Sequence, residues 1–515
     1  MKKKEKFLPG NFNALNRRRF ISAACAACAG AAVPRIMRPG TNGKIRLRVV
    51  FAMHAMTQDK PDWPNLGFDF APVLTQIKNT LTNAFPDMEF LFSTARGAAQ
   101  ASAILAKDLF SKIDGYIVYQ MNNWKLVVQG IAATGKPVLF VDYTYGGTGG
   151  FLVFSAMLLR SGARNVGMVS SQKTEDLIAA VKCFELMKQG GSASDFAAAV
   201  TQTRKERTPG PGDLACAQDP LPRVSIDDAL ARMSESKILA IGYPGVSLGG
   251  IRQIAMEKVS FEELNRLWKD ADPDQAREIA KRWQNSARLI EGVSEETLVS
   301  CAAMYLGMKN MLNQHQANAV TINCLTGFYS GAIQAYPCLG FYELCNEGLV
   351  GACECDVRSA ATMLAVNFLT GGRPGYISDP VLDTSQRKII YAHCVASNRA
   401  FGPAGPANPF EILTHSEDRK GASVRSILPS GYLTTTLEFA PEKKQVLLHQ
   451  AKATGNDPND RACRTKLVAE PIGDFEKLFT MWDKWGWHRV TVYGDLKEQV
   501  FALADKLGYQ VVLEA

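Results

Sequence analysis

Two short apolar runs, Gly115-Tyr-Ile-Val-Tyr-Gln120 and Pro137-Val-Leu-Phe-Val-Asp142, begin at residues that interrupt regular structure. Runs of this length, rich in β-branched and aromatic residues, are typical of buried strands. Upstream, strand-like and helical patterns alternate in the order 45–55, 70–84, 88–93 and 98–112. This alternation predicts βαβ units, and therefore a parallel sheet with helices on both faces.

A glycine-rich segment, Gly146-Gly-Thr-Gly-Gly150, follows the second run and precedes an apolar helical stretch at 151–160. The free N–H groups of a helix N-terminus can hold an anion. The spacing, however, fits neither the G-x-G-x-x-G fingerprint nor a P-loop, because no Gly-Lys-Ser/Thr follows. We therefore interpret this segment as a structural turn.

A second α/β unit is predicted to begin at 165–170. Its expected elements are a helix at 174–188, a loop at 203–222, a strand at 237–243, a charged helical stretch at 261–289 broken near Asp272-Pro273, a helix at 295–314 and a strand at 319–324. After Pro374 the pattern changes to short β-like segments at 388–393, 430–438 and 445–451, followed by a strand–helix–strand at 489–493, 496–507 and 510–513. Short strands separated by Pro and Gly favour a β-rich domain, including a barrel.

The predicted fold class is therefore α/β, with two Rossmann-like parallel-sheet domains followed by a smaller, barrel-like C-terminal domain. A length of 515 residues agrees with about three domains at roughly 150 residues each. We expect an N-terminal α/β domain at 44–164, a second α/β domain at 165–372 that contains Glu354, and a β-rich domain at 373–515.

The composition excludes several classes of protein. Hydrophobic residues make up 46% and charged residues 21%, as in an ordinary globular protein. Of the net charge of +8, +6 lies in residues 1–31, so the rest of the chain is nearly neutral. A near-neutral body lacks the basic surface that nucleic acid binding needs. We expect no nucleic acid partner.

The N-terminus resembles an export signal. Asn16-Arg-Arg-Arg-Phe-Ile21 is followed by a weakly apolar run of small residues up to Val33, with Ala29-Gly-Ala31 as a cleavage site. This pattern is typical of a twin-arginine signal peptide at 1–31, and it predicts a periplasmic protein that the twin-arginine machinery exports. Lipid attachment at Cys25 or Cys28 is the minor alternative, and a disordered basic arm is another.

Ten cysteines lie beyond the signal, too few for a disulfide scaffold. Their spacing between 338 and 355 does not match paired C-x-x-C zinc knuckles. A bond between Cys353 and Cys355 would strain the residue between them. We expect buried free thiols for most of the ten.

The most suggestive stretch for chemistry is Cys353-Glu-Cys-Asp356, followed by a helical run to Leu369, Thr370-Gly-Gly-Arg-Pro374 and a short strand that ends at Asp379. Ligands of open α/β sheets bind at the carboxyl ends of strands. On this argument Glu354 and Asp379 would converge at one edge, while Asp356 would cap the helix. A helix cap plus a surface acid is the alternative on the pattern alone.

Several histidines follow downstream, and three of them, His393, His449 and His488, each lie beside an apolar strand. A histidine in this position is usually a structural hydrogen-bonding residue. Two carboxylates and one imidazole, on the other hand, form an O/O/N ligand set that suits Mn²⁺ or Mg²⁺.

Cys353-Glu354-x-Asp356, Thr370-Gly371, Asp379 and the late Gly486-x-His488 with Gly494-Asp495 together resemble the L-fucose isomerase and L-arabinose isomerase superfamily, especially its fucose-isomerase-like branch. The resemblance extends from about residue 45 to the end, and it is specific at 350–395 and 482–495. It implies a divalent metal, most commonly Mn²⁺, held by Glu354, Asp379 and His488. It also implies a homo-oligomer.

The implied reaction moves a proton between C1 and C2 of a sugar through an enediol, with Glu354 and Asp379 as the acid/base pair. A metal stabilises the negative charge that develops on the carbonyl oxygen. His393 is a second candidate for contact with the substrate. The predicted function is a metal-dependent isomerase of a free or modified monosaccharide outside the cytoplasm.

Two alternatives stay open. One is a carbohydrate-binding or sensing protein on the same scaffold, and the other is a sugar-acid lyase or epimerase that uses the same metal site. Arg358, Arg373 and Arg399 could pair with an acidic group of such a substrate, or they could be ordinary surface charges.

Overall fold

The structure is a computed structural model that describes residues 43–245 and 251–515. The predicted signal peptide at 1–31 lies outside the described residues. Within the described part of the chain, no helix is both long enough and apolar enough to span a bilayer. The predicted fold class is confirmed: two parallel sheets precede a β-rich, closed C-terminal sheet.

The first unit is a five-stranded parallel sheet of order β2-β1-β3-β4-β5. Its strands are β1 (Ile45–Ala52), β2 (Met88–Ala95), β3 (Gly115–Gln120), β4 (Val138–Asp142) and β5 (Val166–Val169). Its helices are α2 (Ala71–Ala84), α3 (Ala98–Asp108), α4 (Val128–Ala132), α5 (Thr148–Arg160), α6 (Thr174–Lys182) and α7 (Ala193–Arg207), with a 3₁₀ turn at Cys183–Met187. The central strands β3 and β4 are buried along their whole length, as their apolar sequences require.

The strand expected to open the second unit belongs to the first. Residues of β5 pair with β4, and α7 packs on β5. The prediction that a new unit begins at residue 165 was therefore wrong about this strand. A strand pattern reveals a strand but not its neighbour, and only pairing shows which sheet it completes. The domain bounds themselves stay a prediction.

The glycine-rich turn between β4 and α5 is structural, as the sequence indicated. A Cβ atom on Gly147 would lie 1.8 Å from the carbonyl oxygen of Gln120, so the turn passes directly against the end of β3. Only glycine permits this approach.

Asp142, at the end of β4, is buried and accepts hydrogen bonds from the Thr148 and Ser170 hydroxyls. Burial raises the pKa of Asp142 to about 7, above its ordinary 3.8. Because the folded protein holds this proton more tightly than the unfolded chain, stability falls as the pH rises from about 4 to about 7. We expect Asp142→Asn to raise the free energy of unfolding by about 2 kcal/mol at pH 8 but not at pH 4. Urea unfolding at both pH values measures this.

The control for that prediction is Asp87→Asn, at an exposed position after α2. A variant of Asp142 that loses stability equally at both pH values would contradict the expectation. Such a result would mean that the carboxylate is needed for its hydrogen bonds.

The second unit contains a four-stranded parallel sheet of order β10-β9-β6-β7. The strands are β6 (Lys237–Ile241), β7 (Ala255–Val259), β9 (Ala319–Ile322) and β10 (Val350–Ala352). The helices are α8 (Ile226–Ser234), α9 (Phe261–Lys269), α10 (Pro273–Ser286), α11 (Glu295–Gln314), α12 (Cys324–Ser330), α13 (Cys338–Asn346) and α14 (Val357–Leu369). The expected helix break falls at Asp272, which caps α10. Helix α11 has the predicted bounds.

The third unit is a closed barrel with one added strand. Its sheet runs β15-β18-β11-β12-β17-β16-β19, and β15 also pairs with β16, which closes it. The strands are β11 (Tyr376–Asp383), β12 (Lys388–His393), β15 (Leu433–Ala440), β16 (Gln445–Asn456), β17 (Thr465–Ile472), β18 (Arg489–Tyr493) and β19 (Gln510–Leu513). The remaining elements are α15 (Leu478–Met481), α16 (Lys497–Leu507), 3₁₀ turns at Pro441–Lys443 and Phe475–Lys477, and a small sheet of β8 (Leu289–Glu291), β13 (Phe410–Leu413) and β14 (Ser423–Ser426).

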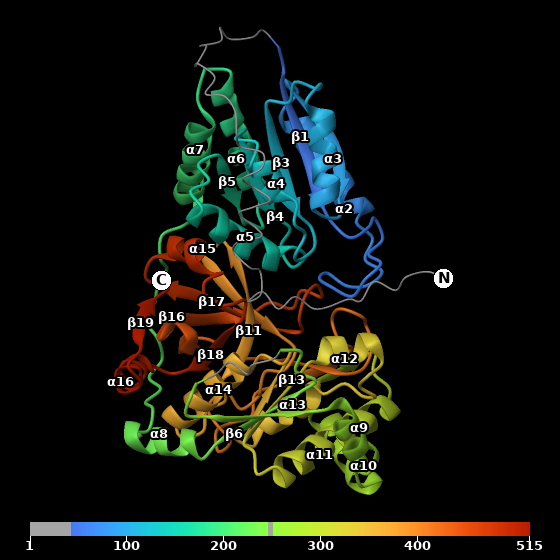
Figure 1. The fold of residues 1–515 in the computed structure, drawn as a ribbon, viewed down its shortest axis with the longest axis vertical. Coiled ribbons are helices and arrows are strands. Elements are labelled where there is room, and N and C mark those ends of the chain that lie inside the picture. The colour runs from blue at the N-terminus through green and yellow to red at the C-terminus, as the bar shows by residue number, and fades with distance from the viewer. Residues whose placement is uncertain (1–42, 246–250) are drawn as a thin grey trace.

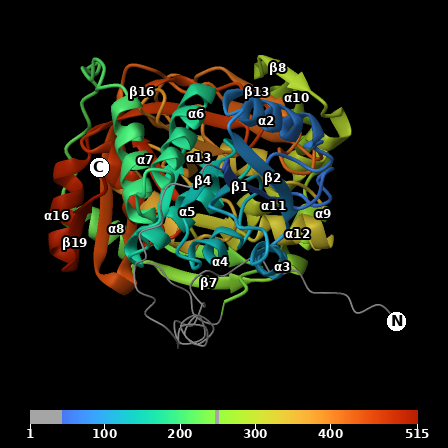
Figure 2. The same cartoon turned by 90° about the horizontal axis from the view of Figure 1, so that it is seen from above.

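The three units are stacked, with the barrel in the middle of the long axis (Figure 1). The first unit overlies the other two when the molecule is viewed along that axis (Figure 2). One apolar cluster joins Phe140 and Phe151 of the first unit to Leu467 and Trp482 of the third. This shared core fixes the first unit on the barrel, and it brings the strand ends of the first sheet toward the barrel's loops.

Candidate active site

The loop after β10 positions Glu354. Glu354 and Cys355 both have left-handed backbone conformations, with φ of 61° and 52°. Such conformations cost about 1 kcal/mol or more per residue and persist only where neighbouring contacts enforce them. Here the Cys355 N–H donates to the Ile322 carbonyl at 2.8 Å, which ties the loop to β9. The strained turn leaves the Glu354 side chain 31% exposed.

Asp356 completes this loop as the N-cap of α14. Its carboxylate accepts hydrogen bonds from the backbone N–H groups of Arg358 and Ser359. The predicted helix cap is thus confirmed.

Asp379 reaches the same place from a different sheet. It lies within β11 of the barrel, opposite Ala392 of β12. The expectation that Glu354 and Asp379 follow parallel strands of one βα unit was wrong, because β11 pairs antiparallel with β12 and β18. The helix α14 carries the chain from the second sheet into the barrel, so the two carboxylates meet where these two layers join.

His488 lies between the two carboxylates. Its Nε2 is 3.2 Å from Asp379 Oδ1 and 3.6 Å from Glu354 Oε2. The structure therefore brings together all three residues that the resemblance implied as metal ligands: Glu354, Asp379 and His488. Their roles as ligands and as an acid/base pair stay a prediction.

Asp356 also orients His488, a role that the sequence did not reveal. Its Oδ2 lies 3.0 Å from His488 Nδ1. Burial acts to raise the pKa of Asp356, but the hydrogen bond and charge of His488 lower it. An ionised carboxylate can only accept, so Nδ1 carries the hydrogen. The other ring nitrogen, Nε2, is thereby directed at Glu354 and Asp379.

His393, the second-rank candidate, belongs to the same cluster. Its ring is 1% exposed, and its centroid lies 5.6 Å from that of His488. Its Nε2 lies 3.7 Å from Glu354 Oε1. Among the described residues, neither nitrogen of His393 has a hydrogen-bond partner, and neither does Nε2 of His488.

The cluster is suited to a cation. Buried polar atoms without partners are uncommon in folded proteins, and binding an ion is one way in which such atoms are satisfied. One ligand atom from each of Asp379, His393 and His488 lies within 4.8 Å of the others, and the same holds for Cys353, Glu354 and His393. Two carboxylates and two imidazoles are hard to intermediate donors, which divalent Mn, Fe, Co and Zn accept.

The charges of the cluster are strongly coupled. Burial raises the pKa of Glu354, and the negative charge of Asp379 raises it further. Burial alone would lower the pKa of His488, but the charge of Glu354 and the hydrogen bond of Asp356 hold it well above its ordinary value.

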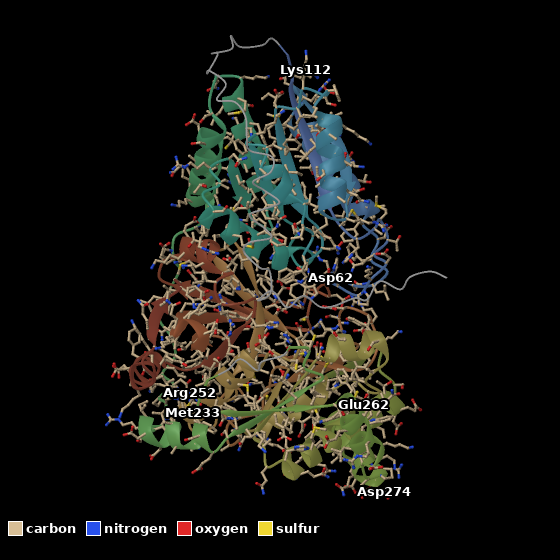
Figure 3. The ribbon with its side chains drawn as sticks, in the orientation of Figure 1. Asp62, Lys112, Met233, Arg252, Glu262 and Asp274 are labelled. Atoms are coloured by element: carbon tan, nitrogen blue, oxygen red, sulfur yellow. The ribbon has the colours of Figure 1, made fainter. Side chains whose placement is uncertain are left out.

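The sequence did not reveal the residues that border the cluster on its far side. Burial raises the pKa of Glu417 to about 8, and the charges of both Asp62 and Glu354 add to this shift. Asp62 accepts from His54, whose other ring nitrogen lies 2.6 Å from Lys125 Nζ. Figure 3 places Asp62 at the level where the first unit meets the rest. The polar run His415-Ser-Glu-Asp418 was the only sequence signal for this border.

The ring of Trp124 gives a second contact across this boundary. It lies edge-on to the ring of Trp487, with ring centroids 5.5 Å apart, and Trp487 directly precedes His488 in the chain. The loop after β3 thus contacts the loop that precedes His488.

Other candidates lie in different contacts. His449 is buried between Tyr391 and Glu514. Arg358 bonds to the Trp485 carbonyl and Glu442, and Arg373 bonds to Asp219 and the Tyr493 carbonyl. Arg399 holds the carbonyls of its own loop, at Pro403 and Gly405. These contacts give all three arginines structural roles.

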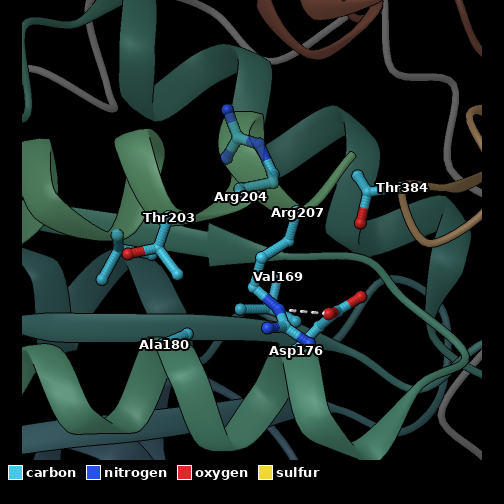
Figure 4. Close-up of a pocket in the computed structure, with 8 residues that line it drawn as sticks. Val169, Asp176, Ala180, Thr203, Arg204, Arg207 and Thr384 are labelled. Atoms are coloured by element: carbon cyan, nitrogen blue, oxygen red, sulfur yellow. Dashed lines mark hydrogen bonds and ion pairs between the residues drawn. The ribbon is translucent and has the colours of Figure 1, made fainter. Parts of the chain in front are cut away.

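A small cavity elsewhere carries no comparable chemistry. Figure 4 shows it between α6 and α7, where Arg207 reaches Asp176 in an ion pair. Its ionic groups are paired, Arg207 with Asp176 and Arg204 with Glu476, so it is an ordinary gap between two helices and a strand.

No family model matches the sequence. A sulfoquinovose isomerase from Priestia aryabhattai is 20% identical over 314 residues, which covers 58% of this chain and 69% of the relative. A sulfoquinovose isomerase from Clostridium sp. (strain MSTE9) is 23% identical over 272 residues, 49% of this chain and 57% of the relative. A third, from Alkalicoccus urumqiensis, is 25% identical over 161 residues, which covers 31% of this chain and 36% of the relative. This distant similarity agrees with a relationship to sugar isomerases.

Proposed function

We propose that this protein is a metal-dependent aldose–ketose isomerase that acts on a modified monosaccharide. The observation that carries the proposal is the convergence of Glu354, Asp379 and His488 around unpartnered imidazole nitrogens. The relatives support an aldose–ketose isomerase. Because they are named for sulfoquinovose, a sugar that carries a sulfonate is the first substrate to test.

Glu354, Asp379, His488 and His393 would hold a divalent cation. When bound, the cation supplies positive charge where the carbonyl oxygen of the substrate becomes negative. Glu354 takes the proton from one carbon and returns it to its neighbour.

Asp379 and Asp356 have separate tasks in this proposal. Asp379 is nearly buried at 5% exposure, and its carboxylate faces His488 Nε2 at 3.2 Å. Asp356 holds the opposite side of the imidazole, so that the ring cannot turn. Glu417 adds a further carboxylate near the site, since its charge and that of Glu354 act on each other.

The test measures metal and activity on the purified chain. Metal content by mass spectrometry is expected to give one tightly held Mn, Fe, Co or Zn per chain. A panel of aldoses and ketoses, with and without an anionic group at the far carbon, is then screened for interconversion. Retention of metal with no conversion of any sugar would contradict isomerase activity and favour a binding protein.

Asp356→Asn is expected to reduce metal affinity and kcat/KM by about 10- to 100-fold, because it removes the acceptor that orients His488. Asparagine still caps α14, so the fold should persist. Titration calorimetry with Mn²⁺ and steady-state kinetics measure the two losses. The matched control is Asp495→Asn. Asp495 follows β18, the strand that His488 precedes, but its carboxylate accepts from Gln450 and not from His488. Equal losses in both variants would contradict an orienting role.

We further propose that the protein is exported by the twin-arginine machinery and works as a homo-oligomer. The support is the sequence at 16–33 and the resemblance, respectively. Cell fractionation tests export: the protein is expected in the periplasm, and Arg17→Lys with Arg18→Lys should retain it in the cytoplasm. Light scattering of the purified protein measures the oligomer.

A further inference from the structure

Two cysteines from separate elements meet directly behind Glu354. Cys324 is the first residue of α12, after β9, and Cys353 follows β10. Because β9 and β10 are paired neighbours, the residues that follow them lie side by side. The two Sγ atoms are 3.2 Å apart, and the residues are 0% and 4% exposed.

We propose that Cys324 and Cys353 form a reversible disulfide that weakens the binding of metal at the adjoining carboxylate cluster. The effect on metal rests on the proposed function, whereas the disulfide itself does not. The proposed proton transfer does not use these thiols, so their position calls for a separate explanation.

The geometry needs little movement. A disulfide has an S–S distance of about 2.05 Å. The two sulfurs must therefore approach by about 1 Å from their 3.2 Å separation. Both lie on short connections at the ends of β9 and β10, where rotation about side-chain bonds and small shifts of the loop can supply this movement.

The same movement acts on Glu354. Its backbone N–H donates to Cys324 Sγ at 3.4 Å, and it follows Cys353 directly in the chain. Its left-handed conformation leaves the loop few other backbone arrangements. Functional groups at a metal must be held within about 0.5 Å, so a displacement of this size at the neighbouring residue lowers metal affinity.

Cys355 provides an internal comparison. It lies on the same turn, but its thiol donates to the Ile241 carbonyl at 3.5 Å and faces a different apolar cluster. The thiols of Cys394 and Cys463 both contact Ser416, with Sγ–Oγ distances of 3.8 and 4.0 Å. Peptide mapping separates all these positions.

The oxidant is a small peroxide. One thiolate attacks a peroxide oxygen, the O–O bond breaks, and a sulfenic acid and one water form. The second thiol then attacks this sulfur and releases a second water. Two thiols and one hydrogen peroxide thus give one disulfide and two waters. A small dithiol reverses the bond by exchange.

The experiment treats the purified, metal-free chain with hydrogen peroxide, alkylates it in denaturant and maps its peptides. A cross-linked pair containing Cys324 and Cys353 is expected, about 2 Da below the sum of the reduced peptides. Mn²⁺ affinity, measured by calorimetry, should fall about tenfold or more and return after treatment with dithiothreitol. In Cys324→Ser the cross-link and the oxidant sensitivity should both be absent, while Cys355→Ser should keep both.

The peptide map tests the disulfide, and the Mn²⁺ titration tests its effect on metal binding. Full alkylation of Cys324 and Cys353 after oxidation overturns the disulfide. A cross-link with unchanged Mn²⁺ affinity overturns its effect on metal, as does oxidant sensitivity that persists in Cys324→Ser. If the reduced chain binds no metal, the proposed function fails, while the peptide map still decides the disulfide.

Discussion

Glu354→Gln is expected to leave the chain folded and to remove isomerase activity by a factor of about 10³ or more. The amide cannot take a proton from carbon, and it is a weaker ligand for a divalent ion than a carboxylate. Glutamine has nearly the same shape, so the strained turn between β10 and α14 should persist. Mass spectrometry is expected to find the bound metal lost or much reduced, and circular dichroism should be unchanged.

The control is Glu442→Gln, at a side chain that is 51% exposed and pairs with Arg358. It should keep its metal and its activity, because an exposed ion pair contributes little. Normal turnover in Glu354→Gln would contradict the proposed acid/base role. Lost turnover with full metal retention would assign Glu354 to proton transfer alone.

Glu514→Ala is expected to lower the free energy of unfolding by about 3–5 kcal/mol, because it leaves the charge of Arg489 buried without its partner. Both side chains are at most 1% exposed, and they bond at 2.7 Å. Glu514 also accepts from His449 at 2.8 Å, in the interior of the barrel. Denaturant unfolding measures the loss, and the exposed Glu498→Gln is the control.

The Glu514 prediction includes a pH dependence. Although burial acts to raise it, Arg489 and His449 lower the pKa of Glu514 to about 2, from an ordinary 4.5. Because the pKa of Glu514 is lower in the folded than in the unfolded chain, its ionisation stabilises the fold at any pH above the unfolded pKa. This contribution is lost as the pH falls from about 5 to about 2. The difference between Glu514→Gln and the unmodified chain should therefore shrink in acid. A constant difference would contradict the ion pair as its source.

The same ion pair supports the candidate site. Arg489 donates to the carbonyls of Trp482, Gly486 and His488, so it clamps the loop that presents His488. Loss of Glu514 should thus weaken metal binding as well as stability. Nothing in the sequence indicates this link, because Arg489 opens β18 whereas Glu514 follows β19.

Local patterns in the sequence were sufficient for the fold class and for many of the elements, although the helix Ala193–Arg207 extends into the predicted loop at 203–222. The apolar runs that became β3 and β4, the caps and proline at Asp272-Pro273, and the short strands after Pro374 are all encoded by nearest neighbours in the chain. The motif residues Glu354, Asp379 and His488 could also be named, because each lies in a short recognisable segment. These inferences need only periodicity, turn chemistry and residue type.

Pairing between distant segments was decided only by the tertiary structure. It assigned β5 to the first sheet, placed Asp379 in an antiparallel barrel and set the left-handed turn at Glu354. It also brought Asp356 to His488 and Cys324 to Cys353. These contacts depend on which strands lie side by side, and a strand's own residues specify its burial but not its neighbour. The candidate ligands could therefore be named from the sequence, whereas the contact of Asp356 with His488 became visible only in the folded chain.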